Sequence, residues 1–433
     1  MKLLPLLLLA ALPALAQPAA NAPLLRAEGP KIVDAQHREV LLQGMNLGGW
    51  LLQEGYMMKP GYGGTQGSVK KVLYGAGLSD AAVEQFYQQW RDQFITKADI
   101  DYIARQGFNC IRLPLHYDLF LTPRQRAVRN GVIRGTVPYA DYVTQLKEWQ
   151  QRGELFQKPQ QLEAIRLIDQ TLGWCAANKL YVVLDLHAAP GAQGTDTNIA
   201  DALQGNDFWN EPVYQTITNE LWAALARRYK NDGRIALYDL VNEPNNVPGG
   251  NAAIHTMLER LISTVRAQGD EHLLLLEGNG YGNNYNELLP SSFTHRQNLV
   301  YNAHRYSILP KYPLSNAPDA SNPDANQLGA IGNLLAFRQS QQVPVWVGET
   351  GENSPEWMGE AARNLNAAGI GWCNWTYKRF SDQPIAALLR IKPPYLVDVK
   401  SAADLPAILA DIKFQNCVPD EGVVRALGAE LKK

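Results

Sequence analysis

The sequence has few features of a metal-dependent or redox protein. It contains only four cysteines among 433 residues, and Cys110, Cys175, Cys373 and Cys417 are widely spaced, with no C-x-x-C pair. Zinc sites usually need such pairs or closely spaced histidines, and the seven histidines form neither an H-x-H nor an H-E-x-x-H motif. We therefore expect no metal and no other cofactor. Cys110 and Cys175 fall on neighbouring expected elements, and Cys373 and Cys417 could do so, but sequence alone does not decide whether either pair forms a disulfide.

The sequence also lacks a marked charge excess and a nucleotide-binding motif. Its formal net charge is −2, from 40 Lys and Arg residues against 42 Asp and Glu residues, so a polyanionic partner such as nucleic acid is disfavoured. Neither G-x-G-x-x-G nor G-x-x-x-x-G-K-[ST] follows the first expected strand. Beyond the N-terminal segment there is no long uncharged apolar run. We expect a monomer with no nucleic acid partner and no stable membrane span.

The one long apolar segment lies at the N-terminus. Met1 and Lys2 precede an almost unbroken run of Leu, Ala and Pro that continues to Ala16. This is the short positive start, apolar core and small-residue end of a secretory signal peptide. The run is too short for a comfortable membrane span, although an uncleaved anchor is the alternative. We expect residues 1–22 to be a signal peptide, cleaved after Ala16 or near Ala22, and the protein to be secreted or periplasmic.

Short apolar runs recur along the rest of the chain, and each is followed by a helical pattern, which is typical of parallel βα units. Several runs are apolar on successive residues, as in LYVVLDL and VPVWVGE, and this favours strands buried on both faces. Eight such strands predict closure into a (β/α)8 TIM barrel, with an open doubly wound sheet as the alternative. The expected strands are Val40–Leu47, Asn109–Leu113, Leu180–Leu186, Ile235–Val241, His272–Leu276, Leu299–Ala303, Val343–Gly348 and Ile370–Asn374.

Segments at both ends add to the barrel. Between Leu25 and Val40, alternating residues around Gly-Pro and Asp-Ala turn signals predict a β-hairpin that could plug the bottom of the barrel. At the C-terminus, VPDEGVVRALGAELKK predicts a helix in an extension that packs on the barrel wall. We expect one barrel domain over residues 23–433, without a separate binding module. The Pro-, Asn- and Asp-rich stretch Leu309–Asn326 is expected as a loop after the sixth strand.

Polar residues collect after the C-terminal ends of the expected strands. In a TIM barrel those ends share one mouth, where barrel enzymes hold their active sites. Two long inserts, Gly55–Leu78 and Leu119–Lys158, leave the same end, and we expect them to be loops that wall or cover a site, with plain surface elaboration as the alternative. The strand-end residues expected to lie together are Arg112, His187, Glu243, His304, Glu349 and Trp375.

Two glutamates follow the fourth and seventh expected strands. Glu243 lies in YDLVNEP, where Pro244 ends the strand pairing and fixes the turn. Glu349 lies in VPVWVGETG, where Gly348 and Gly351 let the backbone turn tightly. Hydrolysis of a glycosidic bond needs one protonated carboxyl to assist the leaving oxygen and one ionised carboxyl to attack or stabilise the anomeric carbon. We therefore interpret the two glutamates as the catalytic pair of a glycoside hydrolase, with two unrelated surface glutamates as the alternative.

Charged residues at other strand ends fit this chemistry. Arg112, in CIRLPLHY, ends the second strand, and an arginine beside Glu349 would favour the ionised carboxylate. A structural ion pair inside the barrel is the other interpretation of Arg112. His187 in DLHAAPG and His304 in YNAHRY could donate hydrogen bonds to sugar hydroxyls or could serve in packing.

Neighbouring polar and aromatic residues complete the candidate site. Tyr306 can place its hydroxyl toward a carboxylate, and Asn242, next to Glu243, can hydrogen-bond a sugar 2-hydroxyl. Trp375 follows the eighth strand in GWCNWTYK and could form a floor on which a sugar ring stacks. Trp372 lies within the same strand, so we expect it in the core.

Together these residues resemble glycoside hydrolase family 5, within the clan of barrel glycosidases that place two glutamates after strands four and seven. The resemblance runs from LLQGMNLGGW to GWCNWTYK, and the segments NLGGWLLQEGY, WRDQFITKADIDYIARQGFNCIRLPLHY and LHAAPGAQG look closest to the exo-β-1,3-glucanase-like members. It implies that Glu243 is the acid/base, that Glu349 is the nucleophile, and that the enzyme retains anomeric configuration without a metal. It further implies a sugar subsite lined by Arg112, His187, Asn242, His304, Tyr306 and Trp375.

The resemblance indicates the catalytic mechanism more firmly than the identity of the substrate. The segment after Arg112 lacks the aromatic pair expected there, and the Leu119–Lys158 insert has no counterpart. We expect a secreted retaining hydrolase that acts on a β-linked oligosaccharide, polysaccharide or glucoside, with β-glucans, including β-1,3-glucan, as the leading substrates. An endo-acting cellulase, a mannanase or a glycosylceramide-cleaving enzyme of the same family is the alternative. A non-catalytic carbohydrate-binding barrel would lose a carboxylate, and a metal-dependent hydrolase would need ligand spacings that the histidines lack.

Overall fold

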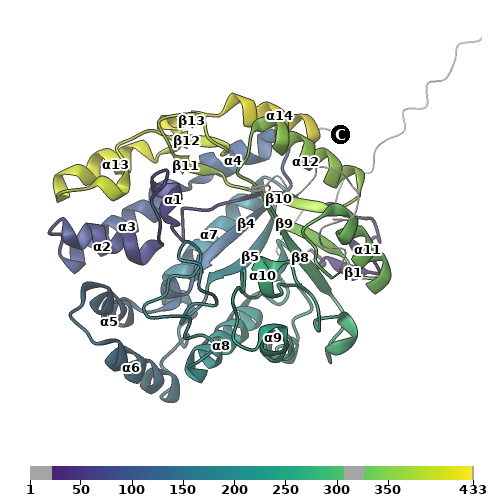
Figure 1. The fold of residues 1–433 in the computed structure, drawn as a ribbon, viewed down its shortest axis with the longest axis horizontal. Helices are drawn as coiled ribbons and strands as arrows, with labels where there is room; N and C mark the ends of the chain where they lie inside the picture. Colours follow the sequence, from purple (N-terminus) through teal and green to yellow (C-terminus); the bar gives the residue numbers. More distant parts are fainter. Residues whose placement is uncertain (1–21, 307–325, 432–433) are drawn as a thin grey trace, which may run out of the picture.

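The computed structural model describes residues 22–306 and 326–431. Apart from Ala22 and Asn326, the expected signal peptide and the stretch Leu309–Asn326 lie outside the described residues. Eight parallel strands form a closed barrel in the order β10-β3-β4-β5-β6-β7-β8-β9 (Figure 1). The predicted (β/α)8 TIM barrel is confirmed, and the open sheet is excluded.

Each barrel strand overlaps one of the eight expected strands. Apart from the first residues of β3 and β5, every residue in these strands is buried. Burial on both faces explains why the sequence runs are apolar on successive residues. The strands are β3 (Gln43–Asn46), β4 (Cys110–His116), β5 (Tyr181–Ala188), β6 (Ile235–Asp239), β7 (Leu273–Leu276), β8 (Leu299–Arg305), β9 (Val345–Gly351) and β10 (Gly371–Trp375).

Helices surround the barrel (Figure 1). Their boundaries follow local signals: Ser354 accepts a hydrogen bond from the Trp357 backbone N–H at the start of α12, where Pro355 occupies the first turn. Inside the ring, the Trp222 indole of α8 donates to the Leu240 carbonyl at 2.9 Å, which ties the helix to β6. The principal helices are α3 (Asp80–Phe94), α4 (Lys97–Gln106), α7 (Glu163–Ala177), α8 (Pro212–Tyr229), α9 (Gly250–Ala267), α11 (Ile331–Gln341) and α12 (Pro355–Ala367).

The predicted N-terminal hairpin is present as β1 (Arg26–Glu28) paired antiparallel with β2 (Lys31–Val33). Leu25 and Ile32 pack in one apolar cluster with Cys110, Leu273 and Val300. These three residues stand first or second in their barrel strands. The hairpin therefore covers the N-terminal end of the barrel, as expected.

All four cysteines are free thiols, so neither pair considered from the sequence is bridged. Gly44 of β3 lies between Cys110 and Cys373 in the register of the sheet. A Cβ atom on Gly44 would lie 2.5 Å from Cys110 Sγ and 2.9 Å from Cys373 Sγ. The two thiols thus fill the space beside the Gly44 backbone, so this position requires glycine.

Both inserts contain helices, although they were expected to be loops. The second insert begins with a capping box in which the Thr122 side chain accepts from the Gln125 backbone and Gln125 accepts from Thr122. Pro123 stands at the first helical position, so the signal for a helix start was present in the sequence. The insert helices are α1 (Gly55–Met58), α2 (Gln66–Gly75), α5 (Pro123–Arg134) and α6 (Tyr139–Gln151).

The C-terminal extension contains the predicted helix, α14 (Glu421–Leu431), which lies beside α12 (Figure 1). It also contains α13 (Leu405–Asp411) and a small sheet that the sequence did not indicate. The sheet consists of β11 (Lys378–Phe380), β12 (Leu389–Ile391) and β13 (Val418–Pro419). Within the described parts of the chain, none of the helices is both long and apolar enough to cross a membrane.

Candidate active site

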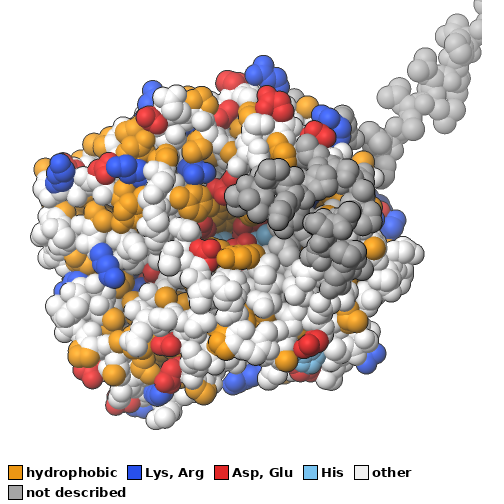
Figure 2. Space-filling model, in the orientation of Figure 1, with side chains coloured by type: hydrophobic (Ala, Val, Ile, Leu, Met, Phe, Trp, Pro, Cys, Tyr) orange, Lys and Arg blue, Asp and Glu red, His pale blue; other side chains and the backbone are white. Residues whose placement is uncertain are grey.

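A cavity of about 550 Å³ opens at the C-terminal ends of the barrel strands. Figure 2 shows this hollow near the centre of one face, with acidic side chains and a histidine visible inside it. A second hollow of about 540 Å³ lies among α3, α5 and α7 and contains none of the predicted site residues. Of the predicted residues, Glu243, His304, Tyr306, Glu349 and Trp375 line the mouth cavity. The other lining residues, which sequence reasoning missed, are Glu54, Tyr56, Asp196, Asn198, Ile199, Tyr281, Asn283 and Glu352.

Glu243 stands on a constrained turn after β6. Its backbone φ is +46°, a left-handed conformation that is uncommon outside glycine. The backbone N–H of Glu243 donates to Glu277 Oε2 at 2.7 Å, and the backbone N–H of Tyr281 donates to the Pro244 carbonyl at 3.2 Å. Because Glu277 directly follows β7, a buried carboxylate from the neighbouring strand fixes the direction of Glu243.

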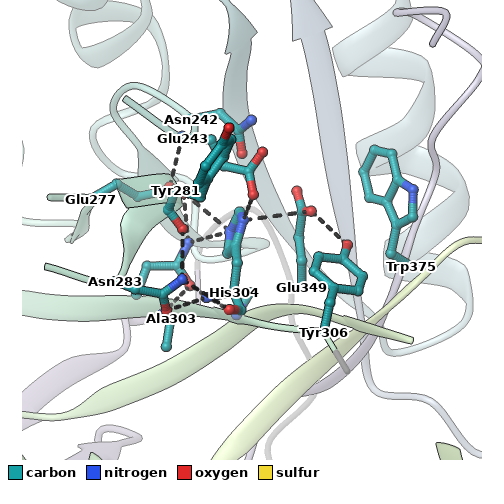
Figure 3. A network of polar contacts seen from close by, with 12 residues as sticks. Asn242, Glu243, Glu277, Tyr281, Asn283, Ala303, His304, Tyr306, Glu349 and Trp375 are labelled. Carbon is teal, nitrogen blue, oxygen red and sulfur yellow. Dashed lines mark hydrogen bonds and ion pairs between the residues drawn. The ribbon is translucent and has the colours of Figure 1, made fainter. Parts of the chain in front are cut away.

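Glu349 lies within β9, and its side chain is only 5% exposed. Arg112 Nη1 donates to Glu349 Oε1 at 2.5 Å. The Tyr306 hydroxyl donates to Glu349 Oε2 at 2.8 Å (Figure 3). Burial by itself raises the pKa of Glu349, but the nearby charges of His304 and Arg112 and the Tyr306 hydrogen bond outweigh it. The pKa of Glu349 therefore lies below its usual range, which favours a carboxylate.

The pKa of Glu243 is shifted in the opposite direction from that of Glu349. Burial raises the pKa of Glu243 to about 7; the charge of His304 opposes this rise, and Glu349 adds to it. His304 lies between the two carboxyls, with its Nδ1 2.5 Å from Glu243 Oε1 and 3.5 Å from Glu349 Oε2 (Figure 3). One pocket thus holds a carboxyl that keeps its proton near neutral pH beside one that does not, the combination that acid/base chemistry requires.

Arg112 also anchors a layer of buried carboxyls below the cavity. Its Nη2 atom lies 2.7 Å from Asp239 Oδ2 and 3.2 Å from Asp185 Oδ2. Burial and the neighbouring charge of Glu277 raise the pKa of Asp239 well above its usual range. Sequence reasoning missed both aspartates, although each is an acidic residue within an otherwise apolar strand. The structural and the functional interpretations of Arg112 are therefore compatible.

His187 is held beneath the cavity. Its Nδ1 lies 2.7 Å from Asp185 Oδ2 and its Nε2 lies 3.3 Å from Glu54 Oε1. The imidazole stacks on Trp375 with ring centroids 5.3 Å apart and an interplanar angle of 11°. Although burial lowers the pKa of His187, the neighbouring carboxylates together raise it to about 10. His187 therefore supports the Trp375 ring as a buried cation.

Asn242 joins this lower layer. Its Oδ1 accepts from Arg112 Nη2 at 2.6 Å, and its Nδ2 lies 3.4 Å from His187 Nε2. Arg112, His187 and Asn242 are each at most 1% exposed and lie next to residues of the cavity wall. None of the three is among the residues that line the cavity. Their expected place in the lining of the sugar subsite stays a prediction. Trp372 is fully buried, as expected for a core residue.

One group among residues 22–306 and 326–431 has the geometry to hold a metal ion. Glu243, His304 and Glu349 each offer one ligand atom, and these atoms lie within 4.8 Å of one another. His304 Nδ1 contacts Glu243 Oε1 and Glu349 Oε2 in this group. The expectation of a metal-independent site stays a prediction.

The second insert reaches the cavity through Asp201. Arg129 of α5 donates to Asp201 Oδ2 at 2.6 Å, and His116 Nε2 lies 2.8 Å from the same oxygen. Asp201 closely follows Asn198 and Ile199, which line the cavity. The insert helix therefore braces a wall of the cavity, which favours that interpretation over plain surface elaboration.

Comparisons with known proteins show the family of the chain and proteins that share its fold. The family described as Cellulase (glycosyl hydrolase family 5) matches residues 73–381. A β-xylosidase from Phanerodontia chrysosporium is 26% identical over 388 residues, which cover 85% of this chain and 74% of the relative. A probable glucan 1,3-beta-glucosidase A from Aspergillus niger is 28% identical over 371 residues, covering 83% and 76%. The crystal structure of an endogalactoceramidase shares the fold, with a TM-score of 0.54, 18% identity, and coverage of 94% of this chain and 84% of that one.

Proposed function

The chain belongs to glycosyl hydrolase family 5 and is a glycoside hydrolase, and from this premise we propose that it cleaves β-linked glucans or glucosides with retention of configuration. The observation that carries the proposal is the opposite electrostatics of Glu243 and Glu349 in one cavity. One carboxyl oxygen of Glu243 lies within 4.8 Å of one carboxyl oxygen of Glu349. Carboxyls about 5–5.5 Å apart are typical of retaining enzymes, whereas inverting enzymes leave room for a water between them.

In the first step Glu243 gives its proton to the glycosidic oxygen, and Glu349 attacks the anomeric carbon. The bond to the leaving group breaks, and a covalent glycosyl-Glu349 intermediate forms. In the second step Glu243, now ionised, accepts a proton from a water that attacks the same carbon, and Glu349 leaves. Two displacements at one carbon restore the original configuration.

The surrounding residues fit these roles. Arg112 and Tyr306 hydrogen-bond the two oxygens of Glu349, and this favours the ionised form that the first step needs. Burial keeps Glu243 protonated until about neutral pH, and formation of the intermediate removes the charge of Glu349. Loss of that charge lowers the proton affinity of Glu243, so the same group can act as the base in the second step.

The substrate proposal rests on the curated relatives. The name of the Aspergillus niger protein supports a β-1,3-linked glucan or a β-glucoside as substrate. A β-xyloside is the second candidate, because the Phanerodontia chrysosporium relative is named a β-xylosidase. The apolar N-terminal segment supports secretion or a periplasmic location.

A substrate panel with product analysis tests the proposal. The purified enzyme should be assayed on laminarin, cellulose, mannan, a glucosylceramide, an aryl β-glucoside and an aryl β-xyloside. We expect hydrolysis of laminarin or the aryl β-glucoside, with the β-anomer as first product in proton NMR. Glu349→Ala should lose activity by orders of magnitude on every substrate, whereas Glu356→Ala, an exposed residue of α12 outside the cavity, should not. An α-anomer as first product, or full activity of Glu349→Ala, would contradict the mechanism.

A further inference from the structure

The proposed chemistry gives the cavity two distinct ends. The leaving oxygen must lie beside the acid Glu243, and the anomeric carbon must lie beside the nucleophile Glu349. Figure 3 shows Glu349 between Glu243 on one side and Trp375 on the other. The ring of the glycone, the sugar that becomes attached to the enzyme, therefore extends from Glu349 toward Trp375.

Two further carboxyls, those of Glu54 and Glu352, line the cavity near Trp375. The Trp375 indole donates to the Tyr56 hydroxyl at 3.0 Å, and Tyr56 lines this part of the cavity together with Glu54 and Glu352. A hydroxyl has a single proton, so Tyr56 can donate to only one of the two carboxylates at a time. The other carboxylate can therefore accept a hydrogen bond from a hydroxyl group of the glycone.

Glu352 is the more accessible of these two carboxyls. Its side chain is 19% exposed, whereas that of Glu54 is 5% exposed and contacts His187. Arg379 Nη1 donates to Glu352 Oε1 at 3.0 Å, and the Arg379 guanidinium lies 4.8 Å from the centre of the Tyr56 ring. Glu352 is thus fixed by a neighbour and yet open to the cavity.

The backbone also directs Glu352 into this site. It stands three residues after Glu349 and has a left-handed φ of +51°, which costs a non-glycine residue conformational energy. Just before it, Gly351 has a φ of +141°, and a Cβ atom there would lie 2.3 Å from the Trp375 carbonyl. The turn that follows the nucleophile is therefore tightly packed against the strand that carries Trp375.

We propose that Glu352 is a specificity-determining residue that accepts a hydrogen bond from one hydroxyl of the glycone, away from the anomeric carbon. This inference rests on the proposed function. Burial raises the pKa of Glu352 to about 7; the charge of Arg379 opposes this rise, and Glu54 adds to it. Above that pH Glu352 is a carboxylate, which is a strong acceptor, and a neutral pyranose offers donors around its ring. A site built to bind a hydroxyl rejects the analogue that lacks it, because the polar group of the protein is then left unpaired.

A double-mutant cycle between protein and substrate tests the assignment. The value of kcat/KM is measured for wild type, Glu352→Ala and the control Glu356→Ala on an aryl β-glycoside that wild type hydrolyses and on its 3-, 4- and 6-deoxy analogues. We expect Glu352→Ala to lose about 10- to 100-fold on the parent glycoside, the range for a hydrogen bond to a charged group. On the one analogue that lacks the bound hydroxyl, the same variant should lose less than about threefold, because the interaction is already absent.

A second variant covers the case in which Glu352→Ala does not fold. Glu352→Gln keeps the shape and a neutral acceptor, so the same cycle should show a smaller selective loss, about three- to tenfold. Equal losses on the parent and on all three analogues would overturn the assignment, because Glu352 would then act without touching a hydroxyl. If wild type hydrolyses no β-glycoside, the proposed function itself fails, and the role of Glu352 falls with it.

Discussion

Replacement of Glu243 by alanine should affect poor leaving groups far more than good ones. Burial raises the pKa of Glu243 from 4.5 to about 7. At pH 6 a carboxyl with that pKa is about 90% protonated, whereas one with the ordinary value is about 3% protonated, a difference of roughly 30-fold in the concentration of active acid. The structure thus provides general acid at a pH where an exposed glutamate would provide almost none.

The sign of the pH dependence follows from the direction of this shift. Because the protonated form is the active one in the first step, kcat/KM of wild type on an aryl glycoside with a poor leaving group should fall above about pH 7. Glu243→Ala should lose this alkaline limb together with about 10²- to 10⁴-fold in rate on the same substrate. An activated aryl glycoside needs little protonic assistance, so it should still form the glycosyl-enzyme nearly normally. Hydrolysis of that intermediate should then be slow.

Azide distinguishes the roles of the two glutamates. Azide needs no general base, so it should restore turnover in Glu243→Ala and give the β-glycosyl azide, identified by its anomeric proton signal in NMR. In the matched variant Glu349→Ala, any rescue should give the α-azide, because azide replaces the nucleophile itself. The α-azide from Glu243→Ala with the β-azide from Glu349→Ala would reverse the assignment. Because burial also raises the pKa of Glu352 to about 7, the pH profile is recorded for Glu243→Ala combined with Glu352→Gln as well. An alkaline limb that is unchanged in this double variant would refute the reasoning from burial.

The other predictions concern metal, stability and processing. A chelator should leave kcat/KM unchanged because two carboxyls suffice for the chemistry; a large loss that added metal restores would instead assign a metal to the group of Glu243, His304 and Glu349. Arg129→Met should lower the free energy of unfolding by about 3–5 kcal/mol in urea titrations, since it removes the arginine from a buried ion pair and leaves Asp201 with its His116 contact. The control Arg134→Met on the same helix removes a partly exposed contact of 3.9 Å to Asp80 and should cost less than about 1 kcal/mol, so equal losses would count against the bracing role. We propose that the exported protein starts after Ala16 or Ala22, and N-terminal sequencing that finds Met1 on soluble protein would disprove it.

The alternation of apolar runs and helical patterns was sufficient to predict the barrel. All eight strands, the N-terminal hairpin and the C-terminal helix α14 were predicted from local pattern. This is possible because burial on both faces of a parallel strand forces apolar residues into successive positions. The helices of the inserts were missed, although the capping box at Thr122 and Gln125 marked the start of one.

Much of the candidate site could also be predicted, since strand ends share one mouth. Glu243, His304, Tyr306, Glu349 and Trp375 do line one cavity, although their chemical roles stay predictions. Glu54 lies several residues after β3, and Glu352 directly follows β9 but lies several residues after the expected strand Val343–Gly348. Both were missed because a loop carboxyl faces the cavity or the solvent according to how the loop packs. A local sequence pattern does not predict which of the two directions a loop carboxyl takes.

The sequence by itself indicated which residues lie in or just after the strands and therefore which of them could meet, although Arg112 and Glu349 lie within β4 and β9 rather than at their ends. Only the tertiary structure decided the electrostatic state of each. Arg112 and Glu349 are 237 positions apart in the chain and in hydrogen-bond contact in the fold. The opposite pKa shifts of Glu243 and Glu349 arise from burial and from charges brought by other strands, and both depend on distances in space rather than on neighbours in sequence.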